Sequence, residues 1–306
     1  MTERTRPAPH GWIVLNKPRG LGSTQAVGLV KRVLRQGGYK KTKVGHGGTL
    51  DPLAEGVLPI ALGEATKLAG RMLDASKIYD FTILFGQQTD TLDTEGEVVD
   101  TSDRIPAREE IEAVLPQFTG AIEQAPPAFS AIKIDGKRAY DLARAGQDVE
   151  MKLRGVTIHA LEIVDAGESE VTLRAHVSKG TYIRSLARDI AHAVGSCGHV
   201  TYLRRIKAGP FLQTEAISLD SAEEIAKGAP IENLLLPLEA GLDDIPVLTL
   251  EPDSAQAVRQ GRVLSDLPQS DGLHLAKLGE TPVALMELEA GSAKVVRGFN
   301  LPDVAE

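Results

Sequence analysis

One carboxylate of this chain is held in a stiff turn. Asp51 follows the glycine pair Gly47 and Gly48 and stands directly before Pro52. The glycines allow tight turns and a close approach of the backbone to a ligand, and the proline biases Asp51 away from helix. A carboxylate immobilised in this way suits nucleophilic or acid–base chemistry. Because Gly, Asp and Pro are also the commonest turn residues, the loop by itself leaves a plain surface turn open.

Other arrangements that could do chemistry are incomplete. The chain has no GxxxxGKS/T phosphate loop, and the stretch from Gly20 to Gln25 lacks the third glycine of a dinucleotide fingerprint. His192, Cys197 and His199 fit no standard zinc spacing. No nucleophile elbow accompanies a histidine and an acid. We therefore expect neither a cofactor nor a metal.

The composition predicts a soluble globular protein of one or two domains. The chain has 306 residues, of which 42% are hydrophobic and 25% charged. No apolar run approaches the roughly 20 residues that span a bilayer, and residues 1–11 lack the apolar segment of a secretory signal. A single cysteine excludes an intramolecular disulfide and fits a reducing compartment. We expect a cytoplasmic protein without a membrane partner.

The net charge of −8 is unevenly distributed. Residues 215–306 contain 17 acids and 6 lysines and arginines, whereas residues 1–214 have a small excess of bases. Within the first part, residues 31–43 (KRVLRQGGYKKTK) hold 6 bases and no acid. Such a segment can contact the phosphates of a nucleic acid, or it can be a solvated helix face followed by a loop. The charges alone do not separate the two interpretations.

Periodicity predicts interspersed helices and strands. Apolar residues recur at helical spacing after a cap at Ser23 or Thr24 and before Gly37. Residues 79–85 alternate in a way that predicts a strand with one apolar face. This mixture indicates an α+β protein. Further strands are expected at 11–16, 57–62, 156–164 and 171–177, and further helices at 65–73, 107–115 and 181–194.

The character of the chain changes near residues 236–246, which combine prolines, a glycine and acids. Beyond this point, short apolar runs alternate with Gly and Pro, which is typical of a small β-rich module. We expect these runs to form strands at 247–250, 273–278, 283–288 and 294–299. The predicted domains are therefore residues 1–243 and residues 244–306.

Several segments resemble, in the same order, motifs of the bacterial tRNA pseudouridine synthase B (TruB) family. The resemblance covers roughly residues 11–214, and the spacing between segments also fits. The segments are LNKPRGLGS at 15–23, HGGTLDPLAEGVLPIALGEATK at 46–67, KIYDFTILFGQQTDTLDTEG at 77–96, PPAFSAIKIDGKRAYDLAR at 126–144, SKGTYIRSLARDI at 178–190 and HVTYLRR at 199–205.

The resemblance implies a fold and a catalytic core. The fold is the pseudouridine-synthase fold, a mixed and mostly antiparallel central sheet flanked by helices, followed by a small C-terminal β-barrel of the PUA type. Asp51 matches the catalytic nucleophile of the family. Arg184, from GTYIR, matches an arginine that pairs with this aspartate. Tyr79 matches a tyrosine that stacks on the flipped target base and for which a part in proton transfer is also implied.

Four further residues acquire substrate-side roles through the resemblance. Tyr182 matches a tyrosine near the catalytic centre, and Leu203 matches a residue that packs near the target uracil. His46 matches a residue that contacts the T-loop where the base has left. Lys17, with Pro18, matches a segment that supports the catalytic loop.

The implied activity is the isomerisation of uridine 55 in the T-loop of tRNA to pseudouridine. The T-stem-loop would be the partner of a monomeric enzyme that needs no protein partner. Two alternatives stay open at the level of sequence: a non-catalytic tRNA-binding or tRNA-folding protein on the same fold, and a pseudouridine synthase for another RNA. A pure binder would not need the constrained carboxylate of Asp51.

Overall fold

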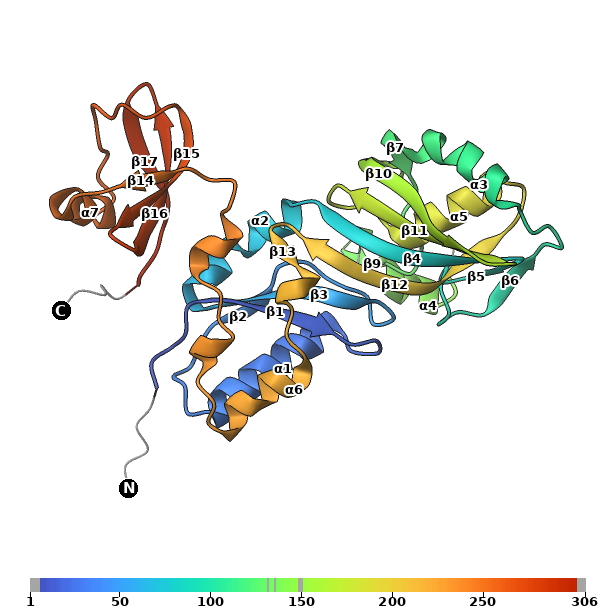
Figure 1. Ribbon diagram of the computed structural model, residues 1–306, viewed down its shortest axis with the longest axis horizontal. Helices are drawn as coiled ribbons and strands as arrows, with labels where there is room; N and C mark the ends of the chain where they lie inside the picture. Colours follow the sequence, from blue (N-terminus) through green and yellow to red (C-terminus); the bar gives the residue numbers. More distant parts are fainter. Residues whose placement is uncertain (1–5, 131, 135, 148–150, 302–306) are drawn as a thin grey trace.

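The computed structural model of the chain describes residues 6–130, 132–134, 136–147 and 151–301. A mixed 9-stranded sheet runs through the larger part of the molecule, and a separate 4-stranded sheet lies at its C-terminal end (Figure 1). The α+β class expected from the sequence is confirmed. The motif at 126–144 includes positions 131 and 135, and the expected C-terminal module includes 302–306, which lie outside the described residues.

The large sheet has the order β1-β3-β12-β4-β11-β10-β7, with β2 added to β3 and β13 to β12. All of its pairings are antiparallel except the one between β3 and β12. Its strands are β1 (Gly11–Lys17), β2 (Val44–His46), β3 (Glu55–Leu62), β4 (Lys77–Phe85), β7 (Gly120–Gln124), β10 (Arg154–Ala166), β11 (Glu170–Val177), β12 (Gly198–Ala208) and β13 (Phe211–Leu212). Two short hairpins are formed by β5 (Gln87–Thr89) with β6 (Val98–Thr101) and by β8 (Lys133–Ile134) with β9 (Lys137–Arg138).

Helices cover the two ends of this sheet (Figure 1). α1 and α6 lie beside β1, β2 and β3, whereas α3 and α5 lie beside β4, β10 and β11. The α-helices before residue 244 are α1 (Ser23–Gln36), α2 (Ala69–Asp74), α3 (Arg108–Val114), α4 (Ala139–Arg144), α5 (Ile183–Ala193) and α6 (Leu219–Glu223). The 3-10 helices are η1 (Gly63–Leu68), η2 (Leu115–Phe118), η3 (Gln213–Glu215), η4 (Glu224–Lys227), η5 (Ile231–Asn233) and η6 (Leu238–Gly241).

The predicted periodicities explain how the core is built. Phe81 and Ile83 of β4 are fully buried, as the alternation of this strand predicts. Tyr79 lies one pleat further along on the same face and packs against the core from its edge. Leu186 and Ile190 of α5 are buried one helical turn apart, so the apolar stripe of this helix packs into the same cluster.

Two local predictions were wrong. The cap of α1 is Gly22 rather than Ser23 or Thr24, because the Ser23 hydroxyl bonds the backbone of Leu50 instead. The helix expected at 65–73 is divided into the 3-10 turn η1 and the short α2. At the other end of α1, the chain leaves the helix at the glycine that the sequence indicates, Gly37.

The C-terminal module has its own sheet and its own core. The sheet has the order β14-β15-β16-β17, and among the described residues it does not close into the barrel that the resemblance implied. A helix that the sequence analysis did not predict, α7, packs against it and contributes Val258 to a core with Leu248 and Met286. The elements are β14 (Val247–Thr249), α7 (Pro252–Arg259), β15 (Gly272–Leu278), β16 (Thr281–Glu289) and β17 (Ser292–Gly298).

The module also packs on the larger part of the molecule. Leu275, Leu285 and Phe299 belong to the same buried apolar cluster as Trp12 and Phe211. Polar contacts surround this cluster: Arg71 pairs with Asp244 at 3.0 Å, and the Lys67 ammonium donates to the Gly298 carbonyl at 2.8 Å. The junction is therefore a packed interface with ionic contacts at its edge.

Candidate active site

The loop that carries Asp51 joins β2 to β3 and is tied down on both sides. The Ser23 hydroxyl accepts from the Leu50 amide at 2.8 Å and donates to the Leu50 carbonyl at 2.9 Å. The Gly20 amide donates to the Pro52 carbonyl at 2.7 Å. Gly48 has a φ angle of +132°, a conformation that residues with side chains rarely adopt. These hydrogen bonds fix the turn that the sequence predicts, and the side chain of Asp51 remains 39% exposed.

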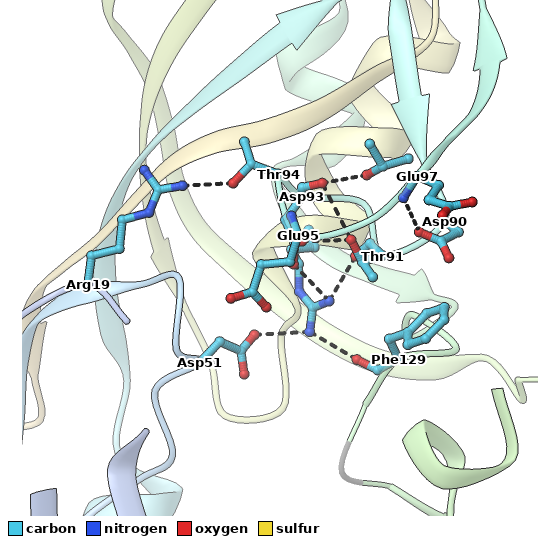
Figure 2. A network of polar contacts seen from close by, with 11 residues as sticks. Arg19, Asp51, Asp90, Thr91, Asp93, Thr94, Glu95, Glu97 and Phe129 are labelled. Carbon is cyan, nitrogen blue, oxygen red and sulfur yellow. Dashed lines mark hydrogen bonds and ion pairs between the residues drawn. The ribbon is translucent and has the colours of Figure 1, made fainter. Parts of the chain in front are cut away.

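Arg184, in the first turn of α5, meets this carboxylate from the opposite side of the cleft. Its Nη2 lies 3.0 Å from Asp51 Oδ2 and its Nη1 lies 3.2 Å from Asp93 Oδ2. The same guanidinium donates to the carbonyls of Thr91 (2.8 Å) and Phe129 (3.1 Å), as Figure 2 shows. The Arg184 side chain is only 8% exposed. Both Nη groups of this buried guanidinium are therefore bonded. Such a group orients the Asp51 carboxylate and also stabilises its negative charge.

Asp93 forms a second ion pair with Arg184. The sequence analysis did not identify this residue. It lies in the acidic loop between β5 and β6, where Leu92 takes a left-handed conformation with φ of +63°. Asp93 Oδ1 accepts from the Thr91 hydroxyl at 2.7 Å and from the Glu95 amide at 2.9 Å. This leaves Oδ2 for the ion pair with Arg184. In the sequence, TDTLDTEG reads as an ordinary polar turn, and only the burial of Asp93 distinguishes it.

A pocket of about 580 Å³ opens above the Asp51–Arg184 pair. Such a volume lies within the usual range for sites that bind small molecules. The pocket lies over the central strands β12, β4 and β11 of the large sheet, with the Asp51 loop on one side and the start of α5 on the other. Of the predicted site residues, those that line it are Asp51, Tyr79, Tyr182, Arg184 and Leu203.

The two tyrosines are held in different ways. Tyr182 exchanges two backbone hydrogen bonds with the side chain of Gln124, at 2.8 and 3.1 Å, and burial raises the pKa of its hydroxyl. Its phenol therefore stays neutral in the ordinary pH range. Tyr79 lines the pocket at the end of the apolar face of β4, so that its ring is available to a planar ligand. Leu203, buried on the neighbouring β12, adds an apolar surface.

Comparisons with known proteins bear directly on this site. A family model described as TruB family pseudouridylate synthase (N terminal domain) matches residues 33–183, and the tRNA pseudouridylate synthase B C-terminal domain matches residues 184–243. The tRNA pseudouridine synthase B of Novosphingobium aromaticivorans is 63% identical over 301 residues, which cover 97% of this chain and 99% of that protein. The chain belongs to the tRNA pseudouridine synthase B family. Members of this family are isomerases that modify tRNA.

Further relatives extend the comparison. The tRNA pseudouridine synthase B of Zymomonas mobilis is 55% identical over 300 residues, covering 98% of this chain and 99% of that protein. Among solved structures, a Cbf5-Nop10-Gar1 complex contains a similar chain, with a TM-score of 0.69, 26% identity and coverage of 95% and 84% of the two chains. An H/ACA RNP bound to a substrate RNA containing 2'-deoxyuridine contains another, with a TM-score of 0.73 at 24% identity over 95% and 86%. The pseudouridine-synthase fold expected from the sequence is confirmed.

Two predicted substrate-side residues of this family member do not line the pocket. Lys17 is fully buried beneath the loop, where its ammonium donates to the carbonyls of Leu21 (2.7 Å), Pro18 (3.0 Å) and Pro52 (3.4 Å). Burial lowers the pKa of Lys17 to about 8, although the nearby Asp51 carboxylate acts in the opposite direction. This position suits support of the loop and excludes direct contact with a ligand in the pocket.

His46 is the second of these residues. It ends β2, pairs with Ile60 of β3 and is half-buried, and its Nδ1 atom is buried without a hydrogen-bond partner. Burial, and then the charge of Arg205, lowers the pKa of His46, so the imidazole is neutral at physiological pH. The structure places it beside the Asp51 loop and outside the pocket lining.

The remaining sequence candidates lie away from the pocket. The bases of residues 31–43 are all exposed, on α1 and on the segment that leads into β2. His192 and His199 bond the side chain of Gln88 and the carbonyl of Gln87, each within 2.9 Å, and Cys197 is buried. None of the helices in the described ranges is long and apolar enough to cross a membrane.

Proposed function

We propose that this protein converts uridine 55 of the tRNA T-loop into pseudouridine, with Asp51 as the nucleophile. The observation that carries the proposal is the Asp51 carboxylate, which lines the pocket together with Tyr79 and Leu203 and is ion-paired to a buried arginine at 3.0 Å. Membership of the family supports tRNA as the substrate. The choice of position 55 rests on the resemblance of the motifs around Asp51 and Arg184.

The target base must leave its stack before Asp51 can reach it. Flipping a nucleotide out of folded RNA costs a few kcal/mol. Stacking of the extruded uracil on the Tyr79 ring offsets about 1–3 kcal/mol of this cost. Leu203 and Tyr182 then bound the base on the other sides of the pocket, and His46 contacts the T-loop outside it, in the space that the base has left.

The reaction breaks the N1–C1′ bond, turns the uracil and forms the C5–C1′ bond. The proton of C5 is lost and N1 takes up a proton, so that the product is an isomer of the substrate. Asp51 can start it by attack at C1′, by attack at C6 of uracil, or by removal of the C2′ proton. Each of these routes needs an ionised and fixed carboxylate. Arg184 provides for both needs, because its charge stabilises the anion and its planar fork sets the direction of the oxygens.

The experiment that tests this proposal uses an unmodified tRNA transcript and a matched transcript with cytidine at position 55. The purified protein should form pseudouridine at position 55 of the first and at no position of the second. Pseudouridine elsewhere in the first transcript would assign the enzyme to another uridine. Binding of both transcripts without any pseudouridine would favour the non-catalytic tRNA-binding protein instead.

The enzyme should also act as a monomer, in the cytoplasm and without a protein partner. Sedimentation of the active preparation at the assay concentration tests it. Activity that appears only in a larger species, or only after a second protein is added, would contradict it.

A further inference from the structure

Arg205, at the end of the HVTYLRR motif in β12, has an unusual environment for an arginine. It is 1% exposed, and among the described residues it has no carboxylate within ion-pair distance. An unpaired buried charge costs several kcal/mol, and arginines are rarely buried without an acid. The role of Arg205 must therefore be sought in the groups that its N–H donors contact.

Most of these donors hold the backbone around Asp51. The Nε atom donates to the Val57 carbonyl in β3 at 2.7 Å. Nη1 and Nη2 donate to the carbonyls of Thr49 (3.2 Å) and Gly48 (3.3 Å), which are the second and third residues before Asp51. A single planar group thus fixes the Asp51 loop relative to the central sheet.

The remaining contact sets the direction of a hydroxyl. Arg205 Nη1 lies 3.5 Å from the Tyr79 hydroxyl oxygen. Because a guanidinium only donates hydrogen bonds, the Tyr79 oxygen must be the acceptor. Its own proton then points away from Arg205, and among the described residues no protein group accepts it. Since Tyr79 lines the pocket, this proton is available to a ligand there.

The surroundings add positive charge to this end of the pocket. Lys77, which also lines it, donates to the carbonyls of Met72, Leu73 and Ala75 within 2.9 Å. Burial, and then the charge of Arg205, lowers the pKa of Lys77 to about 8. A donor that is fixed next to buried cations is well placed to stabilise negative charge that develops on a bound nucleotide.

We propose that Arg205 is a positioning residue of the reaction, which makes the Tyr79 hydroxyl a hydrogen-bond donor to an oxygen atom of the flipped uridine. The inference rests on the proposed function and extends it, because it gives Arg205, to which the resemblance assigned no role, a part in orienting the Tyr79 hydroxyl. Arg205 also borders the pocket, but we assign its effect to the Tyr79 hydroxyl and the Asp51 loop that it holds.

A double-mutant cycle tests this coupling. Tyr79→Phe, Arg205→Lys and the double variant are compared with the parent in single-turnover pseudouridine formation and, separately, in tRNA affinity. Tyr79→Phe keeps the ring and should lower the rate by about tenfold to a hundredfold with little change in affinity. Arg205→Lys should lower the rate similarly, and its effect should be at least about tenfold smaller when Tyr79 is already Phe.

Arg204→Lys is the matched control, since the neighbouring side chain pairs with Glu55 and should leave the rate near the parental value. Effects of Tyr79→Phe and Arg205→Lys that multiply would show that Arg205 does not act through the hydroxyl. Should Arg205→Lys fail to fold, a near-parental rate of Tyr79→Phe would by itself overturn the proposal. A parent enzyme that forms no pseudouridine at position 55 would instead refute the proposed function.

Discussion

The catalytic part and the C-terminal module differ in what they bury. Among the described residues, every buried lysine, arginine and aspartate lies before position 214, and these are Lys17, Lys77, Asp93, Arg184 and Arg205. In residues 244–301, the buried polar residues are His274 and Thr281. Burying a charge is costly unless it is well paired. Buried charges therefore occur around the pocket and not in the described residues of the C-terminal module. We infer that their function is to orient Asp51.

The largest effect should come from Asp51. Replacement by Asn keeps the shape of the side chain and removes its charge and nucleophilicity, so pseudouridine formation should be abolished while tRNA still binds. Single-turnover assays and a binding titration separate the two. Turnover within about tenfold of the parent would remove Asp51 from the chemical step, because loss of a nucleophile normally costs far more.

The next effect should come from Arg184. Arg184→Lys retains a positive charge and loses the planar fork that reaches both Asp51 and Asp93. We expect the single-turnover rate to fall roughly a hundredfold, as for loss of a preorganised donor. Arg188→Lys, one turn further along α5, is the matched control and should be near parental. Equal rates for the two variants would show that charge alone suffices at 184.

A substitution at Asp93 tests whether its ion pair with Arg184 contributes to the rate. In Asp93→Asn the amide nitrogen can replace Oδ2 opposite Arg184, so that two donors face each other. We expect a rate loss of roughly tenfold or more, from a displaced guanidinium. Asp90→Asn in the same loop keeps the oxygen that accepts from the Glu97 amide, and should have little effect. Comparable losses in both would point to loop stability instead.

Removal of the C-terminal module tests whether the chemical step depends on this module. A chain that ends at Asp243 keeps the whole pocket, so the chemical step on a T-loop minihelix should stay within about threefold of the parent, because every side chain around the reacting atoms is retained. Its melting temperature should fall, since Trp12 and Phe211 lose the apolar cover of Leu275, Leu285 and Phe299. A folded, minihelix-binding chain without the chemical step would refute the boundary at 243.

The smallest effect is expected from the exposed bases on the catalytic part. Neutralising five of them together should flatten the plot of log affinity against log salt, by about 0.7–0.9 for each RNA phosphate that the protein no longer neutralises. The chemical step should not change. An unchanged slope would place the phosphate-binding residues elsewhere on the molecule. The residues are Lys31, Arg32, Lys40, Lys41 and Lys43.

Much of the fold could be predicted because its core follows simple periodicities. The alternation of β4 and the stripe of α5 each reflect one apolar face packed against one core. Residues 65–73 were misjudged, since periodicity does not separate a 3-10 turn from the α-helix that follows it. The helix α7 was missed because it is short and stands in a region whose other signals indicate strands.

The site was predictable only where a motif marks it. Asp51, Tyr79 and Arg184 were named through the resemblance, and the structure places all three around one pocket. Asp93 and Arg205 were missed for a physical reason. Their types and neighbours are those of surface residues, and their importance comes from burial by segments more than 90 residues away in sequence, which no local pattern records.

The junction between the two parts contains the single tryptophan of the chain. Trp12 is fully buried, its indole donates to the Leu238 carbonyl at 3.0 Å, and the Phe211 ring lies 5.2 Å away. There is no room for a side chain at Gly241, because a Cβ atom there would lie 2.9 Å from the indole.

Intrinsic tryptophan fluorescence of this protein is consequently a local optical signal. It originates at the junction, and no second tryptophan contributes to it. Detachment of the C-terminal module should shift the emission of Trp12 to longer wavelength as water reaches the ring. Whether the two parts move when tRNA binds can thus be tested in real time without attaching a dye.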